Sequence, residues 1–297
     1  MEPRISVVIN TRNEERNLSY TLRSVRSWAE EIVVVDMYSD DRTVEIARQF
    51  GARVFSHQRL EFADPARAFA ISQATGRWVL ILDADELIPY HLSQKLVEFS
   101  QSEAVDVLKI PRVNYMFGAP LMHSGCGPSQ DMLMRFFRRG SLHTTPAIHD
   151  YLQPVPGARI RELPYEQDCS IVHFAYIDIS QYVEKLNRYT TIEAQQALAS
   201  GKKPAISLAV VHAAGIFLRR YLAQNGFREG WRGFYFSVLS ACYSLISHAK
   251  MTELVMAGPG ETVLAAYQVE AERLLDEYRV SMTSAKYDRG ALEPRPL

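Results

Sequence analysis

The amino-acid sequence predicts a doubly wound, mostly parallel α/β sheet followed by a helical C-terminal region. Apolar, strand-like runs alternate with helical segments over the first 85 or so residues. Polar or acidic residues follow several of these runs, at the strand ends where sheets of this class bind their ligands. From about residue 179 the pattern is helical almost to the end. Together these observations predict a Rossmann-like nucleotide-binding half with a helical extension.

The elements of the first half follow in order. Short β-branched and apolar runs predict strands at residues 5–9, 31–36, 52–55 and 78–82. Amphipathic segments predict helices over residues 14–28 and 63–74, and a third through Phe50 that starts after the cap-type residues 39–43. The run from Trp78 to Leu82 is apolar without alternation, which indicates a strand buried on both faces.

The rest of the chain divides into a loop-rich part and a helical part. Short strands are expected at residues 105–110, 132–137 and 170–174, separated by long loops. Helices are expected over residues 182–199, 205–222, 231–248 and 262–278, with frayed residues after Ser281. We expect a domain at 1–200, with a nucleotide-sugar half at 1–100 and an acceptor half at 101–200, and a helical region at 201–297.

Composition limits the class of protein. The 297 residues include 33 basic and 34 acidic side chains, and a net charge of −1 argues against bulk binding of nucleic acid. The three cysteines form no metal-type pair or disulfide framework, so we expect a reducing cytoplasm. No signal peptide is recognised, and no apolar stretch reaches the roughly 18 to 20 residues of a membrane span. We therefore expect a soluble protein that at most lies on a membrane.

Three carboxylates follow the apolar run within four residues: Asp83, Asp85 and Glu86. Crowded carboxylates beside an apolar interior require a cation. If the strand continues, Asp83 and Asp85 point to the same face, and such oxygen ligands suit Mg²⁺ or Mn²⁺. The glycine patterns of dinucleotide-binding and P-loop proteins are absent after the first strand, where the chain reads TRNEE. A solvated turn is the alternative.

Several segments resemble family-2 glycosyltransferases with the GT-A fold: ISVVINTRNEERNL, IVVVDMYSDDRT and GRWVLILDADE. Later segments are similar to a subgroup of lipopolysaccharide-core β-glucosyltransferases: RFFRR, IHDYL, IVHFAY, YVEKLNRYT and FLRRYLAQNGFREGWRGF. The resemblance covers about residues 4 to 250. It implies an inverting, metal-dependent transfer of a sugar from a nucleotide-sugar, with a UDP-sugar as the expected donor, to a cell-envelope glycan or glycolipid.

The resemblance also assigns residues. It implies a divalent metal, Mn²⁺ or Mg²⁺, held by Asp85 with Asp83, and His149 or His173 as a further ligand or else an ordinary loop or core histidine. The positions matching the nucleotide-sugar contacts are Thr11, Arg12, Asn13, Glu14, Asp36, Arg67, Asp83 and Ala84. For Arg67, whose surroundings depart from the family's pattern, a surface ion pair is an equal alternative. An inverting displacement needs a general base, for which Asp150 and Asp131 are the candidates, and Asp150 is favoured.

The helices at residues 205–248 combine apolar faces with arginines and aromatic residues. This pattern is typical of a helix at a membrane interface, and packing on the catalytic domain or a homodimer contact is the alternative. We expect a cytoplasmic protein, which the membrane alternative would place on the inner face of the cytoplasmic membrane, with a nucleotide-sugar donor and a glycan or lipid-linked acceptor as partners. Two other functions remain open: a catalytically silent binding or scaffold subunit, and a nucleotidyltransferase.

Overall fold

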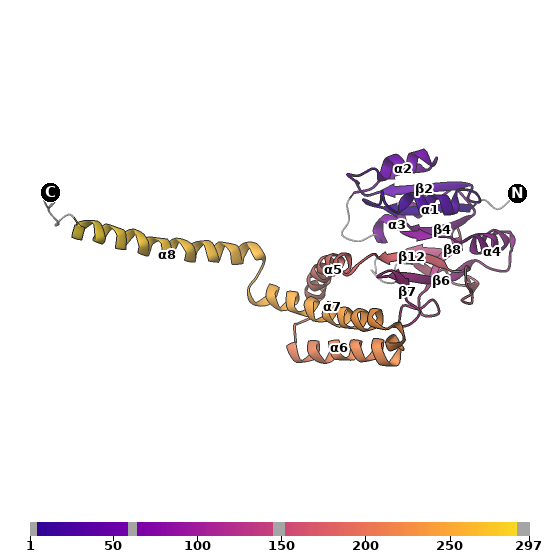
Figure 1. Cartoon of the computed structure of the whole chain (residues 1–297). Helices are drawn as coiled ribbons and strands as arrows, with labels where there is room; N and C mark the ends of the chain where they lie inside the picture. The colour runs from indigo at the N-terminus through magenta and orange to yellow at the C-terminus, as the bar shows by residue number, and fades with distance from the viewer. Residues whose placement is uncertain (1–4, 59–63, 145–151, 290–297) are drawn as a thin grey trace, which may run out of the picture. The chain divides into compact units, whose positions relative to one another are not determined.

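The computed structural model describes residues 5–58, 64–144 and 152–289 (Figure 1). Its first part alternates strands and helices as predicted: β1 (Ile5–Thr11), α1 (Leu18–Val25), β2 (Glu31–Asp36), α2 (Thr43–Gln49), β3 (Arg53–Ser56), α3 (Asp64–Gln73) and β4 (Trp78–Asp83). Helix α1 is shorter than predicted because Asn13 adopts a left-handed backbone conformation, with a φ of 55°, and a turn precedes Leu18.

The second part adds shorter strands and one helix: β5 (Glu86–Leu87), α4 (Tyr90–Gln101), β6 (Val107–Met116), β7 (Ala119–Pro120), β8 (Met132–Arg138), β9 (Leu142–Thr144), β10 (Leu152–Pro154), β11 (Ile160–Glu162) and β12 (Ile171–Tyr176). The main sheet has the strand order β3-β2-β1-β4-β8-β6-β12-β5, and β7 and β11 pair with β6. Strands β1 to β4 are mutually parallel where they pair, and β8 joins β4 in antiparallel orientation. The fold is the predicted GT-A-type α/β sheet.

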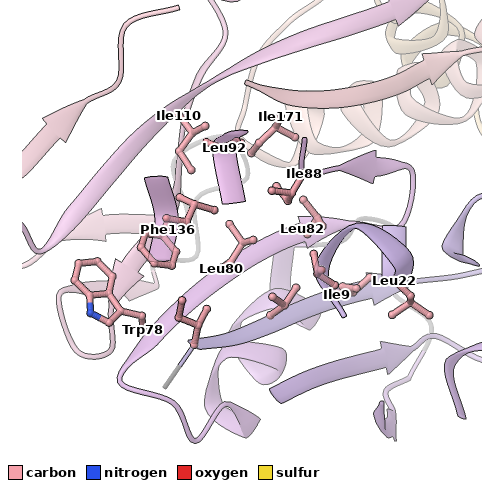
Figure 2. Packing of buried hydrophobic residues seen from close by; sticks show 14 of the residues in the cluster. Ile9, Leu22, Trp78, Leu80, Leu82, Ile88, Leu92, Ile110, Phe136 and Ile171 are labelled. Carbon is pink, nitrogen blue, oxygen red and sulfur yellow. The ribbon is translucent and has the colours of Figure 1, made fainter. Parts of the chain in front are cut away.

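The buried strand β4 lies between two apolar layers. Trp78, Leu80 and Leu82 pack with α1, α2 and α4 on one face, and Val79 and Ile81 pack with α3 on the other. Figure 2 shows the first layer, in which the ring of Trp78 stacks on Phe136 with 4.7 Å between centroids. Burial on both faces explains why the apolar run does not alternate with polar residues. The prediction of a doubly covered strand is confirmed.

The helical part contains α5 (Ile179–Ala199), α6 (Ile206–Leu218), a π-helix η1 (Arg219–Ala223), a 3₁₀ turn η2 (Gly226–Glu229), α7 (Trp231–Met256) and α8 (Gly260–Arg289). Helix α8 continues to Arg289, so the expectation of frayed residues directly after Ser281 was wrong. The chain forms two compact units, Met1–Leu186 with His212–Cys242, and Asn187–Val211 with Tyr243–Leu297. The predicted boundary at residue 200 stays a prediction.

One helical stretch in the described residues, Ile206–Ala223, is long and apolar enough to cross a membrane by length and composition, with a mean hydropathy of 1.3. The expectation that no stretch reaches this length was wrong, because α6 continues directly into η1 and the run extends past two arginines. Length and composition alone are weak grounds for a span, although only 11% of this stretch is buried.

Candidate functional site

The predicted site residues of the first half converge at one edge of the sheet. Strand β1 pairs with β2 so that Thr11 lies opposite Asp36, and with β4 so that Asn10 lies opposite Asp83. Because all three strands are parallel, their carboxyl ends meet there. The structure therefore brings together side chains that lie up to about 70 residues apart in the sequence.

Hydrogen bonds join the turns after β1 and β2 to each other. The Asn13 backbone N–H donates to Ser39 Oγ at 2.8 Å, and the Asp40 N–H donates to Asn13 Oδ1 at 3.0 Å. Ser39 in turn donates from its hydroxyl and its backbone N–H to Asp36, at 2.5 and 3.0 Å. Asp36 is 3% exposed, so a buried carboxylate organises both turns. These bonds fix the position of Asn13 and Asp36.

Polar atoms at the end of β1 are buried without a partner. The amide of Asn10, the hydroxyl of Thr11 and Nε of Arg12 make no hydrogen bond within the described protein. A buried polar atom without a hydrogen bond is unfavourable, and most such atoms in proteins have a partner. This edge of the sheet is thus suited to receive a polar ligand.

Arginines supply cations for Asp83. Arg67 Nη2 lies 2.6 Å from Asp83 Oδ1, and Arg135 Nη2 lies 2.9 Å from Oδ2. Burial by itself would raise the pKa of Asp83, but the guanidiniums of Arg135 and Arg67 hold that pKa well below its usual range. Asp83 is therefore an ionised member of a buried ion cluster. Arg67 contacts Asp83 itself.

Glu86 and Asp131 share a further arginine. Glu86 is fully buried, lies 2.9 Å from Arg112 Nη1, and accepts a hydrogen bond from the Asp83 backbone N–H at 2.8 Å. Arg112 Nε donates to Asp131 Oδ2 at 2.9 Å, and Asn114 Nδ2 donates to the same oxygen at 2.7 Å. Two side chains of β6 thus hold Asp131 in the ion cluster.

Asp85 differs from its neighbours, because in the described part of the chain it forms no ion pair with arginine or lysine. Strand β4 ends at Asp83, so Ala84 and Asp85 lie in the turn before β5, and the condition that would place Asp83 and Asp85 on one face of a continuing strand is not met. His173 Nε2 lies 3.6 Å from Asp85 Oδ2, and the Phe174 N–H donates to the Asp85 carbonyl at 3.0 Å. The turn thus directs Asp85 toward β12.

A divalent cation fits this pair by chemistry. A carboxylate oxygen and an imidazole nitrogen are ligands that Mn²⁺ accepts. Within the described ranges, no group of three or more His, Cys, Asp or Glu side chains is arranged to hold a metal ion. Asp85 and His173 would therefore supply two ligands of an open site. The pKa of Glu14 is raised, mainly by burial and further by the negative charge of the nearby Asp85.

Two predicted residues, His149 and Asp150, lie outside the described residues. Three others were missed in the sequence: Arg112 and Arg135, which neutralise the acidic cluster, and Asn114, which contacts both Asp131 and His173. Arg135 belongs to the RFFRR segment that carried the resemblance, so a signal for it was present. Arg112 and Asn114 lie on a strand with no motif of its own, and only the sheet pairing shows their place.

A comparison with known protein families matches residues 6–154 to the model described as "Glycosyl transferase family 2". The chain belongs to this glycosyltransferase family. An uncharacterised glycosyltransferase of Rickettsia typhi is 26% identical over 260 residues, which cover 84% of this chain and 87% of that protein. The lipopolysaccharide core biosynthesis glycosyltransferase LpsC of Rhizobium meliloti is 25% identical over 255 residues, which cover 83% of this chain and 91% of that protein.

Among solved structures, glucosyl-3-phosphoglycerate synthase from Mycobacterium tuberculosis, in complex with Mn²⁺, UDP and glucosyl-3-phosphoglycerate, matches with 25% identity and a TM-score of 0.33. The match covers 38% of this glycosyltransferase and 44% of the synthase chain, so it spans less than half of either. A similarity at this TM-score supports no inference about the present enzyme. The family match includes Asp36, Asp83, Asp85 and Asp131, whereas His173 lies beyond it.

Proposed function

We propose that this glycosyltransferase transfers a sugar, with inversion, from a UDP-sugar to a cell-envelope glycan or glycolipid, and that a divalent metal assists. The observation that carries the proposal is the placement of Asp85. It is the carboxylate of the strand-end cluster to which the described structure gives no arginine or lysine, and a histidine nitrogen lies 3.6 Å away. Similarity to LpsC, whose name assigns it to lipopolysaccharide core biosynthesis, supports the class of acceptor.

The donor nucleotide is proposed to bind where β1 and β2 end. The turn from Thr11 to Glu14 and the buried Asp36 are held by hydrogen bonds between the turns, as a rigid receptor for a base and ribose requires. The unpartnered polar atoms of Asn10, Thr11 and Arg12 support the same location.

Asp85 and His173 are the residues proposed to hold Mn²⁺ or Mg²⁺. When bound, such an ion neutralises charge that develops on the departing diphosphate. Asp83 is occupied by Arg67 and Arg135, and its proposed role is to fix those two guanidiniums beside the site. Ala84, between the two aspartates, is 4% exposed, and its carbonyl accepts a hydrogen bond from Thr21 Oγ1 at 2.7 Å.

Asp150 remains the proposed general base, on the strength of its sequence context alone. Asp131 is the second candidate. One of its oxygens already accepts hydrogen bonds from Arg112 and Asn114, which supports a role in holding the site. A catalytically silent subunit and a nucleotidyltransferase are the competing functions. The intact Asp85 site argues against the first, and the absence of a glycine-rich basic loop after β1 argues against the second.

The function is tested by measuring UDP release from a panel of UDP-sugars with and without Mn²⁺, in wild type and Asp85→Ala. We expect Mn²⁺-dependent release in the wild type and none above background in the variant. Glu98→Ala, an exposed carboxylate on α4, is the matched control and should keep full activity. Activity in Asp85→Ala equal to wild type would exclude the metal role of Asp85. No turnover with any donor, and no thermal shift with UDP, would favour the silent subunit.

Contact with a membrane surface is proposed within the predicted segment 205–248. Between residues 212 and 242, six apolar or aromatic side chains are 40% to 53% exposed: Leu218, Leu222, Phe227, Trp231, Phe234 and Tyr235. Arg219 and Arg228 are exposed among them. Aromatic and apolar side chains bordered by cations suit the surface of an anionic bilayer.

The structure refines which arginines test this contact. Arg220 donates to the Ser124 carbonyl at 2.6 Å and Arg232 Nε donates to the Phe117 carbonyl at 2.9 Å, so both hold a loop of the catalytic unit. The Arg219→Glu/Arg228→Glu variant should lose sedimentation with anionic vesicles at low salt, whereas the charge-matched Arg23→Glu/Arg48→Glu should keep it. A protein that never sediments, but dimerises with rising concentration in light scattering, would favour the homodimer.

A further inference from the structure

Asn114 lies on β6, is 3% exposed, and stands between Asp131 and His173 in a chain of polar side chains. Its Nδ2 lies 2.7 Å from Asp131 Oδ2 and 3.2 Å from the Cys126 carbonyl oxygen. Carbonyl oxygens accept hydrogen bonds and do not donate them, and Asp131 also accepts from Arg112 at 2.9 Å. The amide nitrogen of Asn114 must therefore face these two oxygens, which fixes the orientation of the amide.

This orientation of the amide determines which ring nitrogen of His173 carries a hydrogen. Asn114 Oδ1 lies 2.7 Å from His173 Nδ1, and an amide oxygen only accepts. His173 Nδ1 must then carry a hydrogen. In the neutral imidazole, Nε2 is left with a lone pair, and Nε2 is the atom that lies 3.6 Å from Asp85 Oδ2.

Strand pairing holds these groups in place. Asn114 lies directly opposite His173 in the parallel pairing of β6 and β12, and His173 lies opposite Glu86 in the pairing of β12 and β5. The distance of 3.6 Å between Nε2 and Oδ2 is too long for a hydrogen bond. A lone pair on Nε2 beside a carboxylate oxygen is a donor set that Mn²⁺ accepts.

We propose that Asn114 is a positioning residue that sets the tautomer of His173. Asp131 orients the Asn114 amide, Asn114 holds the hydrogen on His173 Nδ1, and His173 Nε2 thereby presents its lone pair beside Asp85. What this pair binds rests on the function proposed above. The tautomer does not, because it follows from the protein's own hydrogen bonds in the absence of any ligand.

The test is the ¹⁵N spectrum of the histidine rings in the full-length protein, freed of divalent cations, at about pH 8.5, where an ordinary imidazole is neutral. We expect His173 to show a protonated Nδ1 and an unprotonated Nε2. Asn114→Leu, which keeps the volume but removes the acceptor, should shift His173 toward the other tautomer. Asn114→Gln retains an amide with both a donor and an acceptor and should keep more of the wild-type tautomer than Asn114→Leu. Ser237→Ala removes a buried hydrogen bond within α7 and should leave the His173 signals unchanged.

A second readout is the affinity for Mn²⁺ alone, measured by titration calorimetry. Loss of such a supporting hydrogen bond typically weakens metal binding about 10- to 100-fold, and we expect that loss in Asn114→Leu. A wild-type His173 with its hydrogen on Nε2, or with both nitrogens protonated, would overturn the inference even if no variant folds. An unchanged tautomer in a folded Asn114→Leu would also overturn it. The expected tautomer without Mn²⁺ binding in the wild type would support Asn114's role and refute the metal part of the proposed function.

Discussion

The two aspartates of the strand-end motif should behave as different kinds of residue. Asp83→Asn removes the negative charge that pairs with both Arg67 and Arg135. The side chains of these arginines are only 15% and 7% exposed, so water compensates little for the lost charge. Breaking a buried ion pair from one side typically costs about 3–5 kcal/mol. Asp85→Asn removes no such pair within the described structure and should change stability by less than about 1 kcal/mol.

These energies convert to a measurable difference in melting temperature. For a unit of this size, about 1 kcal/mol shifts Tm by roughly 2–4 °C. Asp83→Asn should therefore lower Tm by roughly 6–20 °C, and Asp85→Asn by no more than about 4 °C. Thermal unfolding followed by circular dichroism, in buffer free of divalent cations at pH 7, measures both. Equal losses for the two variants would refute the division of the motif into a structural and a ligand-binding aspartate.

The difference in stability between wild type and Asp83→Asn should depend on pH in a defined direction. The arginines depress the pKa of Asp83 below its ordinary value of 3.8, so the folded protein binds fewer protons than the unfolded chain near that pH. The stabilisation is fully present above about pH 5 and is lost as pH falls through the folded pKa. The difference in Tm between wild type and Asp83→Asn should thus be constant between about pH 5 and 7 and narrow below about pH 4. A gap that widens on acidification would contradict it.

Three further outcomes are expected. Asp150→Asn should bind UDP-sugar normally, but its rate of sugar transfer in single-turnover assays should fall by about 10²- to 10⁴-fold, and that of Asp131→Asn should fall less. The reverse order of the two rates would assign the base to Asp131. Hydrogen bonds from Arg159 lower the pKa of Asp106 to about 2. Asp106→Asn should therefore lower the free energy of unfolding in urea at pH 7 by about 1 kcal/mol, a modest value because Arg159 is half exposed. This loss should vanish as pH falls from about 4 toward 2, and a loss of stability independent of pH would contradict the reasoning. Glu229 accepts hydrogen bonds from the backbone N–H groups of Met122 and His123 at 2.8 Å each. Glu229→Ala should lower the free energy of unfolding by about 1–3 kcal/mol, and Glu229→Gln should retain part of that stability. Equal stability of Glu229→Ala and wild type would show these bonds to be dispensable.

The order of strands and helices in the first part of the fold could be predicted from the sequence. The strands around Ile9, Val34 and Leu80 could be predicted because each is a short apolar run bounded by helical segments, and both signals are local. The position of Asp36, Asp83 and Asp85 at strand ends followed from the same pattern, because parallel strands share one edge. The sequence left open whether the strand continues to Asp85, since a two-residue turn between acidic residues carries no distinctive pattern, and in the structure β4 ends at Asp83.

Which cation neutralises which carboxylate could not be predicted from the sequence. Asp83 is 52 residues from Arg135, and Asn114 is 59 residues from His173, so no spacing rule joins them. Antiparallel β8 and parallel β12 bring these residues to the site through the order of strands in the sheet. The sequence showed that the acidic cluster needed positive charge, because buried carboxylates repel one another. The fold supplied arginines to Asp83 and Glu86 and placed a histidine beside Asp85, because only the pairing of distant strands determines which side chains meet at the edge of the sheet.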